Sequence, residues 1–506
     1  MPSDPLALSN EARNATLVEE IFRWLRGRVR YADALVEEVS RAEINRVFGG
    51  EEVVKPLSRK GALALRLVGD EGRSLDVSLG LLPFDQLCPT LEAGLKLLAV
   101  QQPNPRFGLA AVPNRDKRRY GVPLEHAPTE DVVLRFALLA EEVARLDRAA
   151  AEAAPGLRVE SEVWAWTQVE EKLVADSEGL FKTQILPATF VQVVSRARDT
   201  ATGRIAEHRT RIGDVHGLEM LFAGGGLRPD FREQIGQSAR RAVLLHGARA
   251  LDAEELKKLT HYVLGTSAMV FVHEAEGHNF EADTIKEGGS GLFHRDGRPT
   301  RVPFGSEQVD VWDGPIRNPD GTFASLSGFG FHFIDDEGVE VTPAHLVRGG
   351  EIVGKLHNRE TAHHFGEANN GRGFSELGDR RLERMTNTYL YPSEKARWVS
   401  SLDELVADIP FGVSLEGSRG GAVSKGGMST TIQFGRLIVN GRLTEERLLP
   451  SNLAVDTQRS LEGVEGFAGP LRCDDPGFCG KGQYKIVTDG GPITRIRAGA
   501  GITLGF

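Results

Sequence analysis

Residues 271–283 read FVHEAEGHNFEAD, the most informative stretch of the chain. Within six positions it places two imidazoles and a carboxylate, on His273, Glu274 and His278. In the common HExxH pattern, both histidines lie on one helix face as zinc ligands and the glutamate acts as a general base. The stretch therefore indicates a metal site with a base beside it.

The spacing of the two histidines is wider than in that pattern. They are five residues apart, which separates them by about 140° around a regular α-helix. Both can reach one metal only if the helix is distorted or ends between them. An i→i+5 π-bulge would do this, and such bulges are frequent at functional sites. We therefore predict a distortion between His273 and His278, with Gly277 at the position where it is easiest.

The ligand set determines the chemistry. Two neutral histidines and a third protein ligand leave a fourth position open for water, whose pKa zinc lowers. Glu274 is placed to take a proton from that water and pass it to a leaving amine. The third ligand stays open between Glu281, three residues after His278, and a distant cysteine. Cys479 is attractive because glycines flank it in GFCGKGQ.

Other candidate motifs give weaker evidence for a functional site. Cys473 and Cys479 are six residues apart, unlike the CxxC of structural zinc sites. His363 and His364 are alternative ligands, but adjacent side chains seldom converge on one ion. Residues 418–427 (SRGGAVSKGG) predict a glycine-rich loop without the order of a phosphate-binding P-loop, and no GxSxG elbow occurs. No residue is assigned to an organic cofactor, and the substrate-binding residues are unknown.

Composition sets the broad class. A chain of 506 residues, 40% apolar and 26% charged, predicts a soluble globular protein of two or more domains. A net charge of −10 argues against a dedicated nucleic-acid binder. Three cysteines make no disulfide framework, and the first residues lack a signal-peptide pattern, so we expect a cytoplasmic protein. No apolar run is long enough to span a membrane.

The periodicity predicts an α+β fold with two domains, 1–240 and 241–506. The N-terminal domain mixes helices with strands that look antiparallel: helices at 16–26, 131–151 and 231–248, and strands at 62–68, 75–79, 158–169 and 189–197. After residue 250 we expect a helix over 253–265 and then a larger, strand-rich region. Its clearest elements are hairpins at 432–448, around Asn440-Gly441, and at 485–497, around Asp489-Gly490-Gly491.

Several ordered motifs resemble those of one known family. HEAEGHNFEAD resembles the HEAxGHxxEAD signature of the TldD/PmbA metallopeptidases. The family's further motifs follow in order: IDDEGVEVTPAHLVRGGEIVG (334–354), RETA (359–362), NNGRG (369–373), ERMTNTYLYP (383–392) and FCGKGQ (478–483), which is similar to its CGKxGQ segment. The resemblance covers about residues 250–506 well and the first half weakly.

The resemblance implies a zinc metallopeptidase. It implies Zn²⁺ held by His273, His278 and Cys479 in the strand-rich C-terminal domain, with Glu274 as the base. Cys473 stays open as the cysteine ligand, because it falls in sequence that looks inserted. The implied substrates are unfolded or extended peptides, including leader peptides of modified precursors. Residues 384–388 (RMTNT) are expected to line the cleft.

The resemblance also implies a partner. Family members form dimers, often of an active subunit with one that lacks the histidine motif. Because this chain keeps HExxxH, it resembles the active TldD type, as a homodimer or paired with a TldE/PmbA-like subunit. We expect the helix with His273 under an antiparallel sheet and Cys479 on a late loop.

Two other functions remain open. One is a non-catalytic regulatory or binding protein with a structural metal, and Glu274 distinguishes it, because a closed site has no use for a base. The other is hydrolysis of amide bonds in small molecules, which would require a narrower cleft than peptide cleavage.

Overall fold

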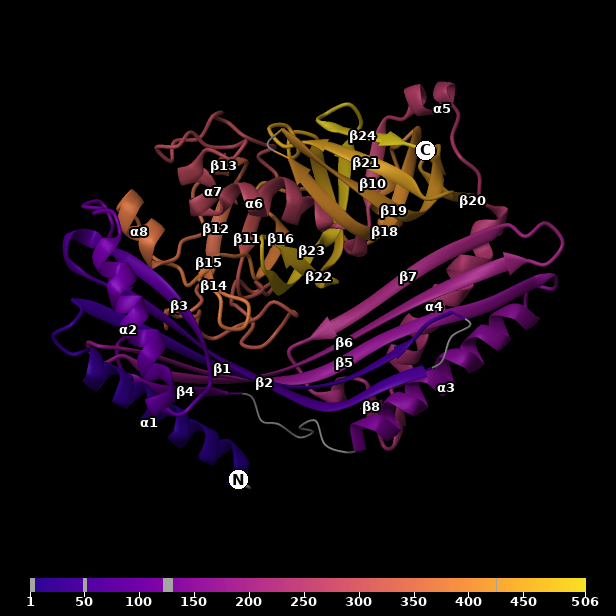
Figure 1. The fold of residues 1–506 in the computed structure, drawn as a ribbon. Coiled ribbons are helices and arrows are strands. Elements are labelled where there is room, and N and C mark those ends of the chain that lie inside the picture. Colours follow the sequence, from indigo (N-terminus) through magenta and orange to yellow (C-terminus); the bar gives the residue numbers. More distant parts are fainter. Residues whose placement is uncertain (1–4, 49–51, 122–130, 425) are drawn as a thin grey trace.

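Two large sheets organise the computed structural model, which describes residues 5–48, 52–121, 131–424 and 426–506. A seven-stranded N-terminal sheet curves beneath a thirteen-stranded C-terminal sheet (Figure 1). Helices pack on the outer side of the N-terminal sheet, and the strand-rich C-terminal part lies over its opposite face. The α+β class predicted from the sequence is confirmed, whereas the domain division at residue 240 stays a prediction.

The N-terminal sheet consists of long strands in the order β3-β2-β1-β5-β6-β4, with β7 also paired to β6. All neighbours are antiparallel except β4 and β6. Its strands are β1 Tyr31–Arg46, β2 Glu52–Val68, β3 Ser74–Gly80, β4 Lys117–Gly121, β5 Leu157–Asp176, β6 Phe181–Asp199 and β7 Ile205–Asp214. The four predicted strands fall inside β2, β3, β5 and β6.

Four amphipathic helices cover this sheet, namely α1 Pro5–Leu25, α2 Phe84–Val100, α3 Asp131–Glu152 and α4 Pro229–Leu244. Ile21 of α1 and Leu91 of α2 are fully buried in one core with Leu65 of the sheet. Phe136 of α3 and Ile235 of α4 are buried in a second core. The three predicted helices are present, although the last one gives way to a 3-10 turn after Leu244.

The C-terminal sheet is mixed, with parallel pairs β10–β18, β16–β23 and β17–β22 among antiparallel ones. Its path is β13-β12-β11-β16-β23-β10-β18-β19-β21-β24; β20 pairs with β19, and β22 with β23. The strands are β10 His261–Leu264, β11 Val309–Asp313, β12 Ala344–Arg348, β13 Glu351–Ile352, β16 Asn387–Pro392, β17 Trp398–Val399, β18 Phe411–Ser424, β19 Gly427–Val439, β20 Arg442–Leu448, β21 Ser451–Asp456, β22 Val464–Gly480, β23 Tyr484–Arg497 and β24 Ile502–Gly505.

Five short α-helices accompany it, and two small ribbons are also present in the described residues, the first of them packed in the core of the N-terminal sheet. The helices are α5 Ala253–Lys258, α6 His278–Phe280, α7 Ala282–Glu287, α8 Arg359–Phe365 and α9 Leu402–Val406. The ribbons pair β8 Phe222–Ala223 with β9 Gly226–Leu227, and β14 Gly373–Phe374 with β15 Leu382–Glu383.

One predicted hairpin is confirmed. β19 and β20 meet at Asn440 and Gly441, whose φ angles of 49° and 74° are those of the turn that Asn-Gly favours. The second hairpin is wrong, because β23 runs without a turn through Asp489-Gly490-Gly491. β22 pairs with it there, and a Cβ on Gly490 would lie 2.5 Å from the carbonyl oxygen of Arg472. Glycine is required at Gly490 because a side chain there would collide with the neighbouring strand β22.

Two further predictions fail because tertiary pairing outweighs the local pattern. The helix over 253–265 ends at Lys258, and His261–Leu264 becomes β10, a buried strand between β18 and β23. The glycine-rich loop at 418–427 is instead the outer end of the β18–β19 hairpin, where Ser424 pairs with Gly427.

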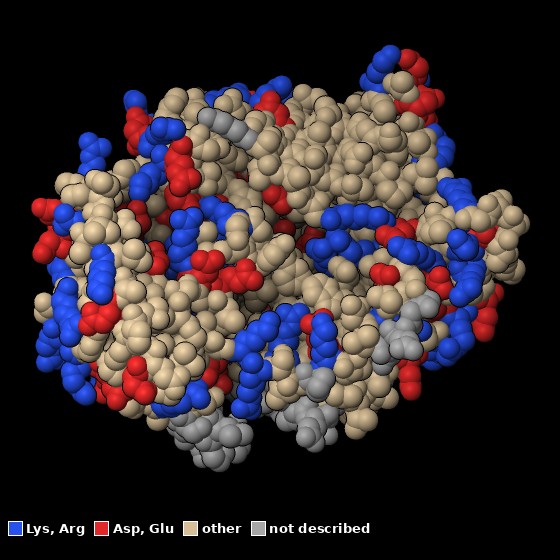
Figure 2. Space-filling view, in the orientation of Figure 1, with Lys and Arg blue, Asp and Glu red and all other residues tan. Residues whose placement is uncertain are grey.

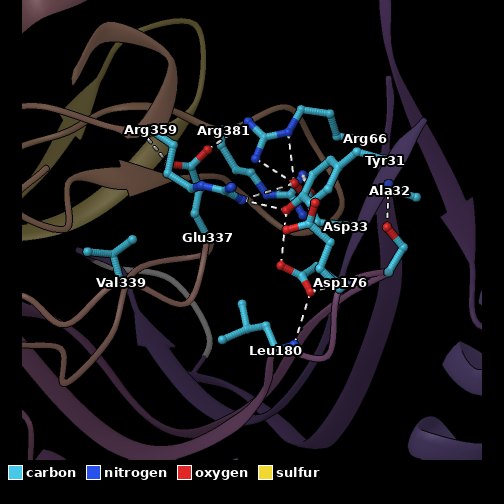
Figure 3. Close-up of polar contacts among 12 residues, drawn as sticks. Tyr31, Ala32, Asp33, Arg66, Asp176, Leu180, Glu337, Val339, Arg359 and Arg381 are labelled. Atoms are coloured by element: carbon cyan, nitrogen blue, oxygen red, sulfur yellow. Dashed lines mark hydrogen bonds and ion pairs between the residues drawn. The ribbon is translucent and has the colours of Figure 1, made fainter. Parts of the chain in front are cut away.

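A buried cluster of charges joins the N-terminal sheet to the C-terminal part (Figure 3). Asp33 on β1 lies 2.6 Å from Arg66 on β2 and 3.0 Å from Arg381 of the C-terminal part. Arg66 also lies 2.7 Å from Glu337. Burial alone would raise the pKa of Asp33, but Arg66, Arg381 and Arg359 hold it below its ordinary value. The carboxylate of Asp33 therefore stays ionised and ties the C-terminal part to the sheet.

Replacing Asp33 tests this junction. Asp33→Asn leaves buried guanidinium groups without their counter-charge, so we expect a loss of roughly 3–5 kcal/mol in the free energy of unfolding. Urea unfolding followed by tryptophan fluorescence measures it. Asp296→Asn, at an exposed pair with Arg298, should leave the midpoint close to that of wild type. Equal midpoints for wild type and Asp33→Asn would contradict the role of the cluster.

Candidate metal centre

The helix that carries HEAEGH is distorted as predicted. Val272–Gly277 forms a π-helical turn that leads directly into α6, and the backbone N–H of His278 reaches the carbonyl oxygen of His273. This is the i→i+5 bond that brings residues five apart onto one face. Position 277 requires glycine, because a Cβ there would lie 1.8 Å from Sδ of the buried Met385.

His273, His278 and Cys479 meet at one point. One donor atom from each lies within 4.8 Å of the others, which makes the three the one such metal-holding group of His, Cys, Asp and Glu found in the described ranges. The imidazole rings are 5.1 Å apart at 89°, and Sγ of Cys479 lies 3.4 Å from Nε2 of His278. Two imidazoles and a thiol form a donor set that fits zinc and leaves a fourth coordination position.

The other ligand candidates lie elsewhere. Cys473 precedes Cys479 on the same strand, with its Sγ against Gly490. His363 and His364 are at the end of α8. Oε2 of Glu281 lies 2.9 Å from Nδ1 of His278, on the side of the ring away from Cys479. Cys479 itself lies near the end of strand β22, not on the loop predicted for it.

Carboxylates hold the back of both imidazoles. Oδ1 of Asp489 lies 2.9 Å from Nδ1 of His273 as an ion-pair contact, and Glu281 forms a hydrogen bond of the same length with His278. Such partners fix the ring orientation and leave Nε2 for a metal. Lys481 is 3.1 Å from Glu281. The sequence-based reasoning missed Asp489, because its Asp-Gly-Gly context predicted a turn.

The group is strongly coupled electrostatically. Burial disfavours the charged form of His278, but Glu281 and Cys479 raise its pKa to about 10. Burial alone would raise the pKa of Cys479, yet His273 and His278 lower it well below the ordinary thiol value. Without a metal, imidazolium and thiolate compensate one another. A bound divalent cation would replace the protons that the imidazoles carry in this charged pair.

Glu274 lies beside this group. Its Oε2 is 3.8 Å from Nε2 of His278, and burial raises its pKa. Gly421 on β18 covers it so closely that a Cβ would lie 2.4 Å from Cγ of Glu274. The glycine-rich strand end thus passes over the carboxylate.

A cleft of about 510 Å³ opens at the group. It is lined by Arg211, Val270, His273, Glu274, His278, Ser418, Gly420–Val423, Asp475, Gly477–Gly480, Val487 and Asp489. Residues 384–388 are not among them, which corrects our expectation. Arg384 is buried and donates from Nη2 to the carbonyl oxygen of Cys479 at 2.5 Å. The segment supports the cysteine strand from behind.

Comparison with known proteins shows which family has a similar C-terminal domain. The model for the PmbA/TldA metallopeptidase C-terminal domain matches residues 260–487, which contain both histidines and Cys479. This stretch of the chain is similar to the C-terminal domain of the TldD/PmbA metallopeptidases. The order of the family's motifs in the sequence and the meeting of three of their residues in space agree with this similarity.

Curated relatives carry the name metalloprotease. One from Methanothermobacter thermautotrophicus is 38% identical over 233 residues, 45% of this chain and 46% of its own. One from Synechocystis is 30% identical over 337 residues, 64% of this chain and 65% of its own. Through these matches the chain spans between about half and two thirds of the length of the family members it resembles.

Solved structures share the fold along nearly the whole chain. TldE from Thermococcus kodakarensis has a TM-score of 0.70 at 13% identity and covers 97% of this chain and 100% of its own. A protein from Thermotoga maritima titled a putative modulator of a DNA gyrase has a TM-score of 0.69 at 17% identity, covering 97% and 99%. At these identities the likeness shows the fold alone.

The close packing at Gly277 gives one test. In Gly277→Ala the new Cβ overlaps Met385, so we expect a loss of about 1–3 kcal/mol in unfolding free energy and weaker zinc binding. Shortening the opposing side chain in the double variant Gly277→Ala/Met385→Ala should restore much of the zinc binding. Thermal unfolding and zinc content per chain measure both. A double variant no better than the single one would contradict the packing argument.

The carboxylate of Asp489, behind His273, provides a second test of the metal centre. Asp489→Asn should weaken zinc binding by about 10- to 100-fold, because the imidazole loses the partner that orients it. Competition with a chromogenic chelator measures the affinity. Asp310→Asn is the matched control: Asp310 is buried and lies 3.2 Å from His345, a histidine outside the group. An equal loss in both variants would count against the proposed orienting role.

Proposed function

We propose that this chain is a zinc metallopeptidase that hydrolyses peptide bonds in unfolded or extended peptides. The observation that carries the proposal is the meeting of His273, His278 and Cys479 in an open cleft, with the half-buried carboxylate of Glu274 beside them. The metallopeptidase family model and the names of the relatives support it.

The residues divide into holding and proton-transfer roles. His273, His278 and Cys479 would hold zinc, with Asp489 and Glu281 orienting the imidazoles. When bound, zinc supplies a Lewis acid that polarises the peptide carbonyl and lowers the pKa of water. Glu274 takes a proton from the attacking water and passes it to the leaving amine. Its raised pKa suits this work near neutral pH.

The shape of the cleft favours an extended substrate. Phe478 lines both the metal cleft and a neighbouring cavity of about 570 Å³. Arg211, Ser418 and Asp475 line both the cleft and a third cavity of about 550 Å³ on its other side. Figure 2 shows the hollow between the two sheets. A row of three cavities suits several residues of an unfolded chain, such as a leader peptide, better than a small amide.

The non-catalytic alternative has less support. A closed structural site needs a fourth protein ligand and no base, whereas this group has three members and opens to a cleft. The putative gyrase modulators share only the fold with this chain.

Assembly and location belong to the proposal as well. The likeness to TldE and one relative from Haemophilus influenzae named a TldD homolog support a homodimer or a pair with a TldE/PmbA-like subunit. No helix in the described ranges combines the length and the apolar character that crossing a bilayer needs. We propose a cytoplasmic location from the cysteine usage, and no nucleic-acid or membrane partner from the acidic charge and hydropathy.

Replacing the base separates metal binding from catalysis. Glu274→Gln should keep about one zinc per chain while cleavage of denatured casein falls by about 10²- to 10⁴-fold, because no group accepts the proton. Elemental analysis and a fluorescent casein assay measure the two. Chelation of wild type should abolish cleavage, and added zinc should restore it.

The matched control lies two residues away. Glu276 is fully buried, accepts a hydrogen bond from Ser460, and has its pKa raised by burial to about 8. It is protonated at neutral pH, so Glu276→Gln should cleave like wild type. Full activity in Glu274→Gln would overturn its role, and a wild-type chain that binds no zinc would overturn the proposed function.

A further inference from the structure

Strand β7 brings one arginine to the metal cleft and a second to the cavity that adjoins it. Arg209 and Arg211 are two residues apart and therefore lie on the same face of the strand. Arg211 lines the metal cleft together with His273 and Glu274. Both arginines line the adjoining cavity of about 550 Å³. In Figure 2, Lys and Arg side chains gather in the hollow where β7 passes beneath β18.

These two arginines differ from their neighbours in having only neutral hydrogen-bond acceptors. Arg209 donates from Nη2 to the carbonyl oxygen of Ser418 at 2.7 Å, and Arg211 from Nε to Oε1 of Gln192 at 3.1 Å. By contrast, Arg241 pairs with Glu416 and Arg419 with Glu207. In the part of the chain that the structure describes, neither Arg209 nor Arg211 forms an ion pair.

Burial makes a positive charge without an ion pair costly. It lowers the pKa of Arg209 to about 9, and the positive charge of Arg211 lowers that pKa further. The carboxyl that compensates both arginines most, Asp475, is itself buried, and burial raises its pKa to about 7. Glu207 and Asp489 compensate them less. Two partly desolvated cations at the wall of a cleft are stabilised by an incoming anion.

We propose that Arg209 and Arg211 form a subsite that binds a carboxylate of the peptide substrate beside the metal group. This inference rests on the proposed function, because it assigns the pair to the same cleft. Guanidinium groups bind carboxylates through paired hydrogen bonds, which fix position as well as charge. The carboxylate comes either from the free C-terminus of the peptide or from an Asp or Glu side chain near the scissile bond.

A matched peptide set distinguishes the two sources. One unstructured, fluorescently labelled peptide is made with a free or amidated C-terminus, each with Glu or Gln in the sequence. Zinc-loaded wild type should cleave at least one carboxylate form with a kcat/KM about tenfold or more above that of the amidated Gln peptide. A preference for the free C-terminus assigns the subsite to the chain end, and a preference for Glu assigns it to a side chain.

Variants connect that preference to the arginine pair. In Arg211→Gln the ratio of kcat/KM between the preferred peptide and the amidated Gln peptide should fall toward one, mainly through KM. Arg211→Lys should keep part of the ratio, because it keeps the charge without the paired hydrogen bonds. Arg158→Gln, at an exposed arginine of the same sheet, should keep all of it. A ratio within one variant is independent of the fraction that has folded.

A binding measurement separates this inference from the proposed function. Fluorescence anisotropy of the same peptides on Glu274→Gln protein reports affinity without cleavage. We expect tighter binding of the carboxylate form, lost on adding Arg211→Gln and weakened by salt. If no peptide is cleaved but this difference in binding persists, the subsite stands and the peptidase assignment fails. Equal binding of all four peptides, or a preference unchanged in Arg211→Gln, would overturn the subsite.

Discussion

Two imidazoles five residues apart face one point only if the helix that carries them is wider than an α-helix. The π-helical turn at Val272–Gly277 provides that geometry, and the surrounding packing maintains it. Gly277 lies so close to Met385 that a side chain at position 277 would have no room. Arg384, the residue before Met385, donates to the carbonyl oxygen of Cys479. One buried segment thus positions both the histidine turn and the cysteine strand.

Buried charges hold the parts that surround this centre. Asp33 of the N-terminal sheet pairs with Arg66 and Arg381, and Asp313 of the C-terminal sheet lies 2.7 Å from Arg372. Thr388 also donates to Asp313. A buried ion pair gives little net stability because both charges lose their hydration, but removing one partner is costly. The Asp33 cluster therefore specifies how the N-terminal sheet meets the C-terminal part, and the Asp313 cluster orders the C-terminal part itself.

The same balance of burial and charge distinguishes the functional residues. At the metal group, carboxylates behind the imidazoles and a thiol in front of them compensate the buried charge. Along β7, by contrast, Arg209 and Arg211 have no carboxylate partner in the described residues. Arg211 lines the metal cleft and Arg209 the adjoining cavity, and this position without a counter-charge is the physical basis for assigning them to a substrate carboxylate.

The sequence by itself determined the local features of this protein. The HExxxH spacing predicted the π turn, Asn440-Gly441 predicted its hairpin, and the periodicity placed the long helices and strands, because each depends on residues close together in the chain. Tertiary structure alone decided whether Cys473 or Cys479 joins the histidines, and that Asp489 lies in a strand behind His273. It also made β10 a strand and hid residues 384–388 behind the cleft. Those outcomes depend on partners far away in the sequence, whose pairing and close packing outweigh local preference.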